Sequence, residues 1–522
     1  MQHTPVLIVG GSLVGLSASL FLAMRGVDHI LLEKHAGSSP HPRAMGFTER
    51  TLEFYRAAGI EDRIPQTPPD TRLRRVRADS LAGHWSDALP WTPGADETPP
   101  GHFSPCTGAA IPQDRLEPIL REAASGCGAD LRYRHRLLDW HEVDDGIVAH
   151  VADLDTGSQY RLHARYLIAC DGADSPIRER LGVVREGVGH LRNVRSVLFR
   201  CEAADAYLAR GVQQFQIEQP GLRGFLTTYG DARWALMFDD DSERTSSELE
   251  GMVRQALGAD LPFELVTTGR WEMAGRIARD YRAGRVFLAG DGAHQLPPTR
   301  GGFGANTGID DVYNLAWKLQ LVLAGIAGSA LLESYSAERQ PIGWLRHQQT
   351  FARPDYARWL ETPPEVPLYG NAAMELGQLQ RSSVILGAGP ELPAAADPTT
   401  WAGQPGTRAP HAWVERRGTR ISTLDLFTRS FVLVSAHADW LSAGLDAASR
   451  LGLPIETIRV GVDIVFQQPA DFPAGFGVDA EGAVLVRPDG VIAWRQPSSG
   501  GEADRRSLLA GVLRKAAAIP AR

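Results

Sequence analysis

Hydrophobic residues at the start of the chain switch between the spacing of strands and the spacing of a helix. The apolar run 5–10 (PVLIVG) predicts a buried strand, 16–26 (LSASLFLAMRG) a helix that ends at a glycine, and 28–33 (DHILLE) a second strand. The glycine-rich turn 11–15 (GSLVG) joins the first strand to the helix. Together these segments predict a βαβ unit, which is typical of an α/β fold with a parallel sheet.

Farther along, the pattern predicts two more units. Residues 190–275 contain strand-like runs such as VRSVLFRC and GFLTTYG, which predict an antiparallel sheet inserted into the first domain. The run 285–290 (RVFLAG) returns to that domain and is followed by helices, whereas 65–105 is predicted to form long loops. After a Pro- and Ala-rich stretch at 388–410, alternating strand and helix patterns predict a further α/β unit of about 110 residues, a plausible size for a domain.

Composition narrows the range of functions. The chain has 522 residues, enough for two or three domains, and is 43% hydrophobic and 22% charged, as in an ordinary globular protein. Its net charge of −8 without a basic run argues against nucleic acid as a partner. No apolar run reaches the ~18 residues of a membrane-spanning helix. Because a strand is predicted to begin by Val6, we expect no signal peptide. The four cysteines form no Cys-x-x-Cys pair and no metal-ligand spacing, so we expect a metal-free cytoplasmic protein.

The turn after the first strand has the spacing of a dinucleotide-binding fingerprint. Gly10 and Gly15 occupy the positions that need a tight turn and close helix packing, and Ser12, small and able to bond a phosphate, replaces the middle glycine. Glu33 ends the second strand, where a carboxylate can accept hydrogen bonds from the ribose of an adenosine. A glycine-rich turn alone can be structural, but the βαβ context and Glu33 favour a nucleotide site. We expect that site to include Gly10, Ser12, Leu13, Val14, Gly15, Glu33 and Lys34.

A second motif follows the strand that ends near residue 290. Asp291 at the end of this strand is placed to bind a ribityl hydroxyl, and a Pro pair and a glycine-rich loop then lead into a helix beginning near Ala305. The first amides of that helix would face a group that carries negative charge, such as the N1/C2=O edge of a flavin. A glycine-rich connection before an amphipathic helix is the simpler alternative, and the order of Asp, Pro pair, glycines and Asn argues against it. The expected contacts are Asp291, Pro298, Gly304, Ala305 and Asn306.

These motifs, in this order, resemble the group A flavoprotein monooxygenases, the FAD-dependent hydroxylases of p-hydroxybenzoate and phenol. The segment YLIACDGADSP resembles the family's Asp-Gly motif, with its aspartate at Asp171. HPRAMGFTERTLEFYRAAGI looks like the family loop in which an arginine, here Arg43, lies near FAD, and IPQDRLEPILRE looks like the helix whose glutamine, here Gln113, contacts FAD. The likeness covers about residues 1–360. It is closest to hydroxylases of aromatic polyketides of the anthracycline and tetracenomycin types.

The resemblance implies a fold: α/β, with a Rossmann-like FAD-binding domain, an inserted antiparallel-sheet substrate domain and a C-terminal thioredoxin-like domain. Without a Cys-x-x-Cys pair, the last domain is expected to be structural or to support a dimer, not to be redox-active. The implied divisions are the FAD-binding domain at 1–75, 104–185 and 276–395 (the last with a helical linker), substrate-domain loops at 76–103, the substrate-binding sheet at 186–275 and the thioredoxin-like domain at 396–522.

The resemblance also implies the reaction. NADPH or NADH reduces FAD, and O2 then forms a flavin C4a-hydroperoxide that hydroxylates a bulky phenolic substrate, expected to be an aromatic polyketide. We expect Arg43 to contact the transient nicotinamide cofactor and Pro298 to lie over the flavin and exclude water. His294, near the Pro pair, is expected to be structural. Approximate alignment with the family places substrate contacts at Phe215, Gln216, Trp234 and Arg381, although aromatic residues on strands are more often core.

Other functions remain open at this point. An antibiotic-inactivating or Baeyer–Villiger-type monooxygenase would share every cofactor motif, and an FAD reductase would use no O2. A non-catalytic flavin-binding protein would bind FAD without substrate-stimulated oxidation of NAD(P)H. The expected partners are a small aromatic molecule and O2, with no membrane and no nucleic acid, and the chain is expected to be a monomer or a homodimer.

Overall fold

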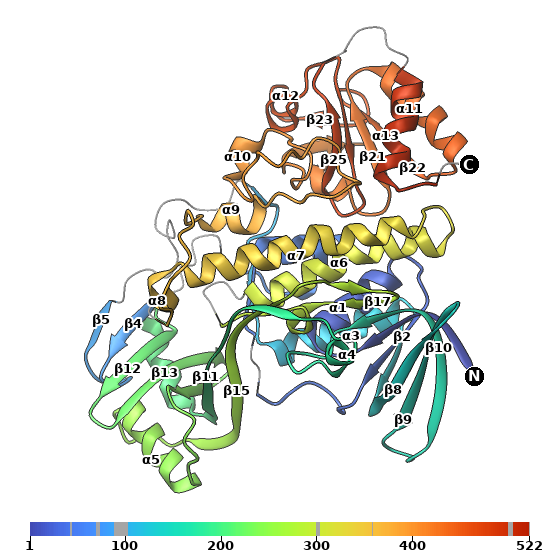
Figure 1. The fold of residues 1–522 in the computed structure, drawn as a ribbon. Helices are drawn as coiled ribbons and strands as arrows, with labels where there is room; N and C mark the ends of the chain where they lie inside the picture. The colour runs from blue at the N-terminus through green and yellow to red at the C-terminus, as the bar shows by residue number, and fades with distance from the viewer. Residues whose placement is uncertain are drawn as a thin grey trace.

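The first part of the chain folds around a mostly parallel sheet (Figure 1). The computed structural model describes residues 1–41, 44–68, 74–87, 103–298, 303–357, 359–498 and 505–520. In sheet order the strands are β16 (Arg282–Ala283), β17 (Val286–Leu288), β10 (Gln159–Ala169), β1 (Gln2–Val9), β2 (His29–Glu33) and β7 (Asp130–Tyr133), with β9 (Gly146–Asp153) and β8 (His135–Val143) added beside β10. β1, β2, β7, β10 and β17 run parallel, so their carboxyl ends meet at one edge.

Helices cover this sheet at the positions that the sequence pattern predicts. The helices are α1 (Leu13–Ala23), α2 (Glu49–Ala57), α3 (Gln113–Gly126) and α6 (Phe303–Leu323). α1 connects β1 to β2, which confirms the βαβ unit, and packs against α3 and α6. Because both partners and the sheet surround it, α1 is apolar on almost every side.

A second sheet forms the lobe at the lower left of Figure 1. In sheet order its strands are β18 (His294–Gln295), β15 (Glu264–Ala278), β11 (Arg185–Arg200), β14 (Arg233–Phe238), β13 (Leu222–Gly230), β12 (Gln214–Gln219), β4 (Arg75–Ala78) and β5 (Trp85–Asp87). β4 and β5 correct the prediction of loops throughout 65–105. These short strands gain their order from a parallel pairing of β4 with β12, about 140 residues later in the chain, which no local pattern reveals.

The two faces of the second sheet have different surroundings. Along β14, Trp234, Leu236 and Phe238 face a core that includes Val253, Ala256 and Leu257 of α5 (Ser246–Leu257). Ala235 and Met237 alternate onto the other face, where they cluster with Leu198, Tyr229 and Met45. Met45 belongs to the first part of the chain. The second face therefore lies toward the parallel sheet and its motifs.

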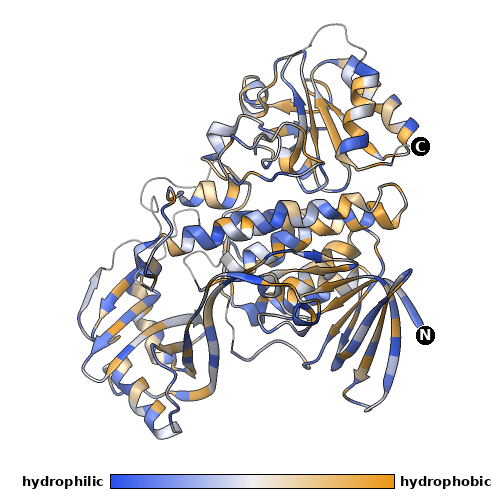
Figure 2. Cartoon of the chain, in the orientation of Figure 1, coloured by the Kyte–Doolittle hydropathy of each residue, from blue (hydrophilic) through white to orange (hydrophobic). Residues whose placement is uncertain are grey.

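A long helix, α7 (Ala330–Phe351), lies with α6 between the parallel sheet and a C-terminal α/β unit (Figure 1). The sheet of that unit has the order β22 (Ile455–Arg459), β21 (Phe431–Ser435), β24 (Ala483–Val486) and β25 (Ile492–Gln496). α11 (Ala438–Leu451) and α13 (Arg505–Ala516) pack beside it. Figure 2 shows apolar residues concentrated along its central strands.

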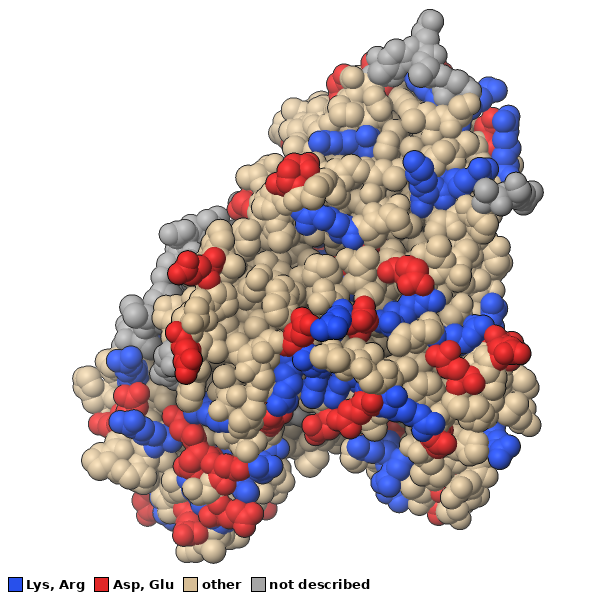
Figure 3. Space-filling model, viewed as in Figure 1, with Lys and Arg blue, Asp and Glu red and all other residues tan. Residues whose placement is uncertain are grey.

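Shorter elements complete the fold. They are β3 (Gly46–Phe47), η1 (Glu61–Arg63), β6 (Ala109–Ala110), α4 (Pro176–Arg180), η2 (Glu202–Arg210), η3 (Gly290–Gly292), α8 (Pro354–Ala357), α9 (Asn371–Leu376), α10 (Pro398–Trp401), β19 (Trp413–Arg416), β20 (Thr419–Ser422), η4 (Thr423–Leu426), β23 (Val465–Phe466) and α12 (Asp471–Phe476). Figure 3 shows acidic and basic side chains interspersed on the visible face. Among the helices in the described ranges, none has the length and apolar character needed to cross a membrane.

Candidate functional site

Four segments that are far apart in the sequence meet at the carboxyl edge of the parallel sheet. The Gly10 turn follows β1, Cys170 follows β10, Gly290 follows β17, and α6 begins nearby. A methyl group at Gly10, which has a φ of +103°, would collide with the carbonyl of Cys170, and one at Gly308 of α6 would lie 2.7 Å from a Val14 methyl. Only glycine permits such close approach of backbones. In open α/β sheets, ligands bind in the crevice at this edge.

Ser12 lies at the start of α1, but its hydroxyl is already engaged. Its Oγ donates to Oε1 of Glu117 at 2.7 Å and accepts a hydrogen bond from Nε2 of Gln113 at 2.9 Å. The Ser12 hydroxyl thus has two partners within the protein, and its contact with a phosphate stays a prediction. The backbone amides at the first turn of α1 have no acceptor within the helix, as at any helix N-terminus.

Glu33 is the last residue of β2, and Lys34 beside it is exposed. Its Oε2 accepts from the backbone N–H of Gly11 at 2.7 Å, and its Oε1 accepts from the backbone N–H of His35 at 2.7 Å. The side chain is 11% exposed. Nδ1 of His35 also lies 2.7 Å from Oε1. A carboxylate has about four acceptor positions, so with these three contacts one position is left for a ribose hydroxyl.

Two aspartates from different strands face the same region. Oδ2 of Asp171 accepts from the N–H of Ile177 at 3.3 Å, whereas its Oδ1 is buried without a hydrogen-bond partner. Burial raises the pKa of Asp171 above its usual value. Asp291 is exposed, and its Oδ1 lies 3.7 Å from the position that a Cβ of Gly304 would occupy. A buried acceptor without a donor is costly, and hydroxyl groups of a bound nucleotide fit this pair.

The start of α6 supplies backbone donors. The helix begins at Phe303, so the amides of 303–306, among them those of Gly304 and Ala305, have no acceptor within the helix. The side chain of Asn306 is used by the protein itself. Its Oδ1 accepts from the N–H of Thr48 at 3.1 Å, and its Nδ2 donates to the carbonyl of Gly46 at 3.1 Å. Asn306 thus holds the loop before α2 against the first turn of α6.

The four predicted substrate residues lie in different environments and do not form one site. Phe215 and Trp234 are 0% exposed and pack in the core under α5, so they cannot contact a substrate from where they lie. Nε of Arg381 donates to the carbonyl of Gly389 at 3.1 Å, so its guanidinium holds a loop of the linker. Gln216 alternates onto the Met45 side of the sheet, because its pairing partner is Phe225 and not Leu226.

Two further residues, Arg43 and Pro298, were predicted to lie near the flavin. Arg43 lies outside the described residues, and its role stays a prediction. Pro298 is exposed, and its carbonyl accepts from the hydroxyl of Tyr356 at 2.7 Å.

Sequence reasoning missed a buried charged group beneath the motifs. Asp311 of α6, His294 and Arg339 are all 0% exposed, and Oδ2 of Asp311 accepts from Nε2 of His294 at 2.7 Å. His294 is therefore a buried partner of Asp311. The sequence carries a signal for this group, because two pairs of charged residues, 310–311 and 338–339, interrupt the apolar patterns of two helices. The sequence does not show that the two pairs contact each other. No group of three or more potential metal ligands occurs within the described part of the chain.

Comparison with known proteins identifies the class. Residues 3–350 match the family model of an FAD binding domain, and residues 402–517 match that of the C-terminal region of aromatic-ring hydroxylases. The chain is 37% identical to tetracenomycin A2 monooxygenase-dioxygenase of Streptomyces glaucescens, over 99% of this chain and 98% of the relative. It is 36% identical to 4-methyl-5-nitrocatechol 5-monooxygenase of Burkholderia sp., over 94% of each. A crystal structure of a ternary complex of aklavinone-11 hydroxylase with FAD and aklavinone matches with a TM-score of 0.87 and 34% identity, over 99% of both chains.

The chain therefore belongs to the FAD-dependent aromatic hydroxylases and is a flavoprotein monooxygenase. This confirms the predicted family, enzyme class and flavin cofactor.

Proposed function

We propose that the chain hydroxylates a bulky phenol of the aromatic polyketide class, with FAD lying across the carboxyl edge of the parallel sheet. The observation that carries the proposal is the meeting of the Gly10 turn, Asp171, Asp291 and the first turn of α6 at that edge. The names of the tetracenomycin and aklavinone enzymes support the substrate class. The nitrocatechol enzyme favours a second candidate, a single-ring phenol.

The chain's own groups would hold FAD along its length. The first amides of α1 bind the diphosphate, and Glu33 accepts from the adenosine ribose. Asp171 and Asp291 would accept from hydroxyl groups of FAD, and the amides at the start of α6 would donate to the negatively charged part of the flavin. The chemistry that bound FAD would supply is the uptake of a hydride and the activation of O2. The protein orients it and excludes water.

We propose that the substrate binds against the Met45 face of the second sheet, defined here as Leu198, Tyr229, Ala235 and Met237 with Met45 itself. This face is apolar but partly accessible, because Met45 and Met237 are only partly buried. Gly46, next to Met45, is bonded to Asn306 in the first turn of α6. A flat aromatic ring on this face would therefore lie near the flavin end of the site. Aromatic ligands gain most of their affinity from such apolar contact.

Neighbouring residues of β14 provide a matched test of that surface. Met237→Ala removes contact area from the Met45 face, so we expect KM for a phenolic substrate to rise about 3- to 10-fold, which corresponds to about 0.7–1.4 kcal/mol. Leu236→Ala changes the adjacent residue, which is 0% exposed under α5, and should cost about 2–5 kcal/mol of folding stability with KM little changed. Steady-state kinetics and urea unfolding measure both. Equal effects of the two variants on KM would rule out this face as the substrate surface.

The C-terminal unit is proposed to be thioredoxin-like and non-redox. Its sheet order and its helices α11 and α13 support the fold, and none of the four cysteines lies in the 402–517 segment. NADPH or NADH is proposed as the transient reductant, as is usual for this family.

Asp291 gives the direct test of the FAD site. Asp291→Asn should weaken FAD binding about 10- to 150-fold, because a charge-assisted hydrogen bond contributes about 1.5–3 kcal/mol. Titration of apoprotein with FAD, followed by quenching of flavin fluorescence, gives Kd. The exposed Asp260→Asn serves as a control for the loss of one negative charge. If both variants bind FAD as the wild type does, the proposed placement is wrong.

The reaction is tested with purified holoenzyme and a panel of phenols. An aromatic polyketide phenol should stimulate oxidation of NADPH or NADH and yield a product that carries one atom from 18O2. Better turnover of a nitrocatechol would favour the single-ring candidate. Oxidation of NAD(P)H without any oxygenated product would point to the reductase alternative and contradict hydroxylation.

A further inference from the structure

We propose that Arg339 of α7 is a positioning residue for the FAD-binding turn at Gly290 and Asp291. Its neighbour Glu338 links α7 to the C-terminal unit, so that this unit also helps to hold α7 and Arg339 in position. The inference rests on the FAD site proposed above. It assigns a role to the buried ion network between α6, α7 and the C-terminal unit, which none of the cofactor motifs includes.

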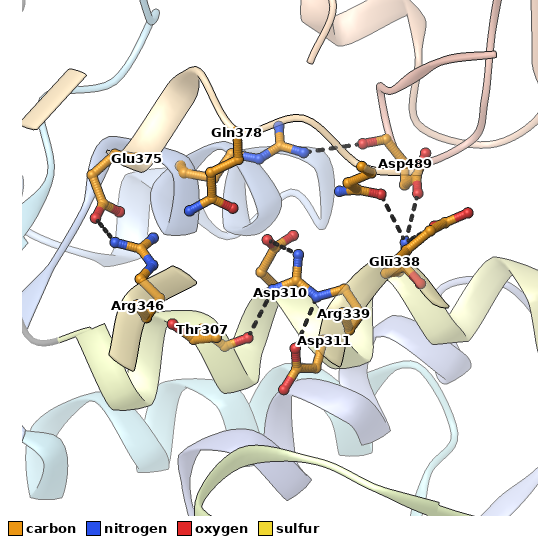
Figure 4. Close-up of polar contacts among 12 residues, drawn as sticks. Thr307, Asp310, Asp311, Glu338, Arg339, Arg346, Glu375, Gln378 and Asp489 are labelled. Atoms are coloured by element: carbon orange, nitrogen blue, oxygen red, sulfur yellow. Dashed lines mark hydrogen bonds and ion pairs between the residues drawn. The ribbon is translucent and has the colours of Figure 1, made fainter. Parts of the chain in front are cut away.

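Arg339 contacts the second and third turns of α6 through three nitrogens (Figure 4). Its side chain is 0% exposed. Nε donates to Oδ1 of Asp311 at 2.8 Å, Nη1 lies 2.6 Å from Oδ2 of Asp310, and Nη2 donates to the carbonyl of Thr307 at 3.4 Å. The contact of Nη1 with Asp310 is an ion pair and not a hydrogen bond. A planar guanidinium can direct its nitrogens at oxygens on different residues in this way, whereas a compact ammonium group cannot keep the same geometry. Arg339 therefore fixes the helix segment that directly follows the flavin-facing amides.

Asp311 extends this contact to the turn after β17. Its Oδ2 accepts from Nε2 of His294 at 2.7 Å and from the backbone N–H of Gly290 at 3.4 Å. Burial alone would raise the pKa of Asp311, but His294 and Arg339 outweigh burial and lower it, so the carboxylate stays charged. One side chain thus joins α7, α6 and the residue before Asp291. A Cβ on Gly308 would lie 2.8 Å from Cα of Gly290, so helix and turn are packed too closely to shift independently.

Glu338 faces the opposite way, toward the C-terminal unit. Its Oε1 accepts from Nη1 of Arg487 at 2.8 Å, and its Oε2 accepts from Nζ of Lys318 at 2.8 Å. Arg487 also pairs with Asp489 at 2.5 Å. The four side chains are at most 3% exposed and carry two positive and two negative charges. A buried network of this kind tolerates the loss of a member poorly, because it leaves an unpaired charge. The C-terminal unit therefore holds α7 at the residue next to Arg339.

Three conservative arginine variants on the holoenzyme test the proposal. Arg339→Lys keeps the charge but loses the three-way contact, and should raise Kd for FAD about 10-fold and shift the midpoint potential of bound FAD to more negative values, since the α6 amides are less well aimed at it. Arg487→Lys should raise Kd about 3-fold or more through Glu338. Arg346→Lys is the control, because Arg346 lies on the same helix about two turns after Arg339, in a buried pair with Glu375 at 2.5 Å. It should lower thermal stability without changing Kd or the potential.

The Kd values and midpoint potentials of these variants distinguish a positioning role of Arg339 from a general loss of protein stability. If Arg339→Lys keeps the wild-type Kd and potential, or if Arg346→Lys weakens FAD binding as much, the positioning role is overturned. A wild-type Kd in Arg487→Lys overturns the part played by the C-terminal unit. Failure of the FAD site itself would look different, since Asp291→Asn would then also bind FAD normally.

Discussion

Gly15→Ala is expected to raise Kd for FAD at least 100-fold, which corresponds to about 2.7 kcal/mol or more. Gly15 lies in the first turn of α1, and a methyl group there would overlap the carbonyl oxygen of Gly10. The obstructing atom belongs to the backbone of the fingerprint turn, so no side chain can rotate away. α1 would have to move off the turn, and its first amides would leave the diphosphate position.

A second glycine on a helix serves as the matched control. Gly251 lies within α5, is exposed, and has nothing within 4 Å of the position of an added Cβ. Gly251→Ala should therefore raise stability by about 0.8–1 kcal/mol through helix propensity alone and leave FAD binding unchanged. Fluorescence titration and urea unfolding are the measurements. A Gly15→Ala protein with wild-type affinity would show that FAD does not depend on this close approach.

The helices around the site could be predicted from the sequence because their signals are local. The apolar spacing and the terminal glycine locate α1, and the turn residues locate the start of α6 to within two residues. The glycines of the fingerprint carry their own signal, since the chain needs them where backbones meet. β4 and β5 were missed because their order comes from pairing with a distant strand.

The positions of the backbone turns in the site could be predicted from the sequence. The contacts that the side chains make there could not. Trp234 was predicted as a substrate contact, and only the structure shows that it faces the core under α5 while Met237 of the same strand faces Met45. Ser12 was placed correctly at the turn, and only the structure shows its hydroxyl turned to Glu117, 105 residues away. Arg339 and Asp311 meet across two helices, and this contact depends on how the helices pack.

Glu49→Gln is expected to raise the free energy of unfolding by about 3 kcal/mol at pH 8. Glu49 is the first residue of α2, next to Thr48, and is 9% exposed. Burial, together with the negative charges of Glu375 and Glu53, raises its pKa from 4.5 to about 7, although Arg408 opposes the shift. A glutamine keeps the shape of the side chain and removes the ionisation.

The free energy of unfolding depends on pH because Glu49 binds its proton more tightly in the folded chain than in the unfolded chain. Between pH 4.5 and 7 the folded chain keeps a proton on Glu49 that the unfolded chain has lost, so stability falls as pH rises through this window. The shift of about 2.5 pH units corresponds to about 3 kcal/mol once the pH exceeds 7. Glu49→Gln should match the wild type near pH 4.5 and exceed it at pH 8 in urea unfolding, with Glu250→Gln on the exposed side of α5 controlling for the change in net charge. An equal difference between Glu49→Gln and wild type at both pH values would show that Glu49 ionises freely in the folded protein, and that the first turn of α2 carries no buried charge against α9.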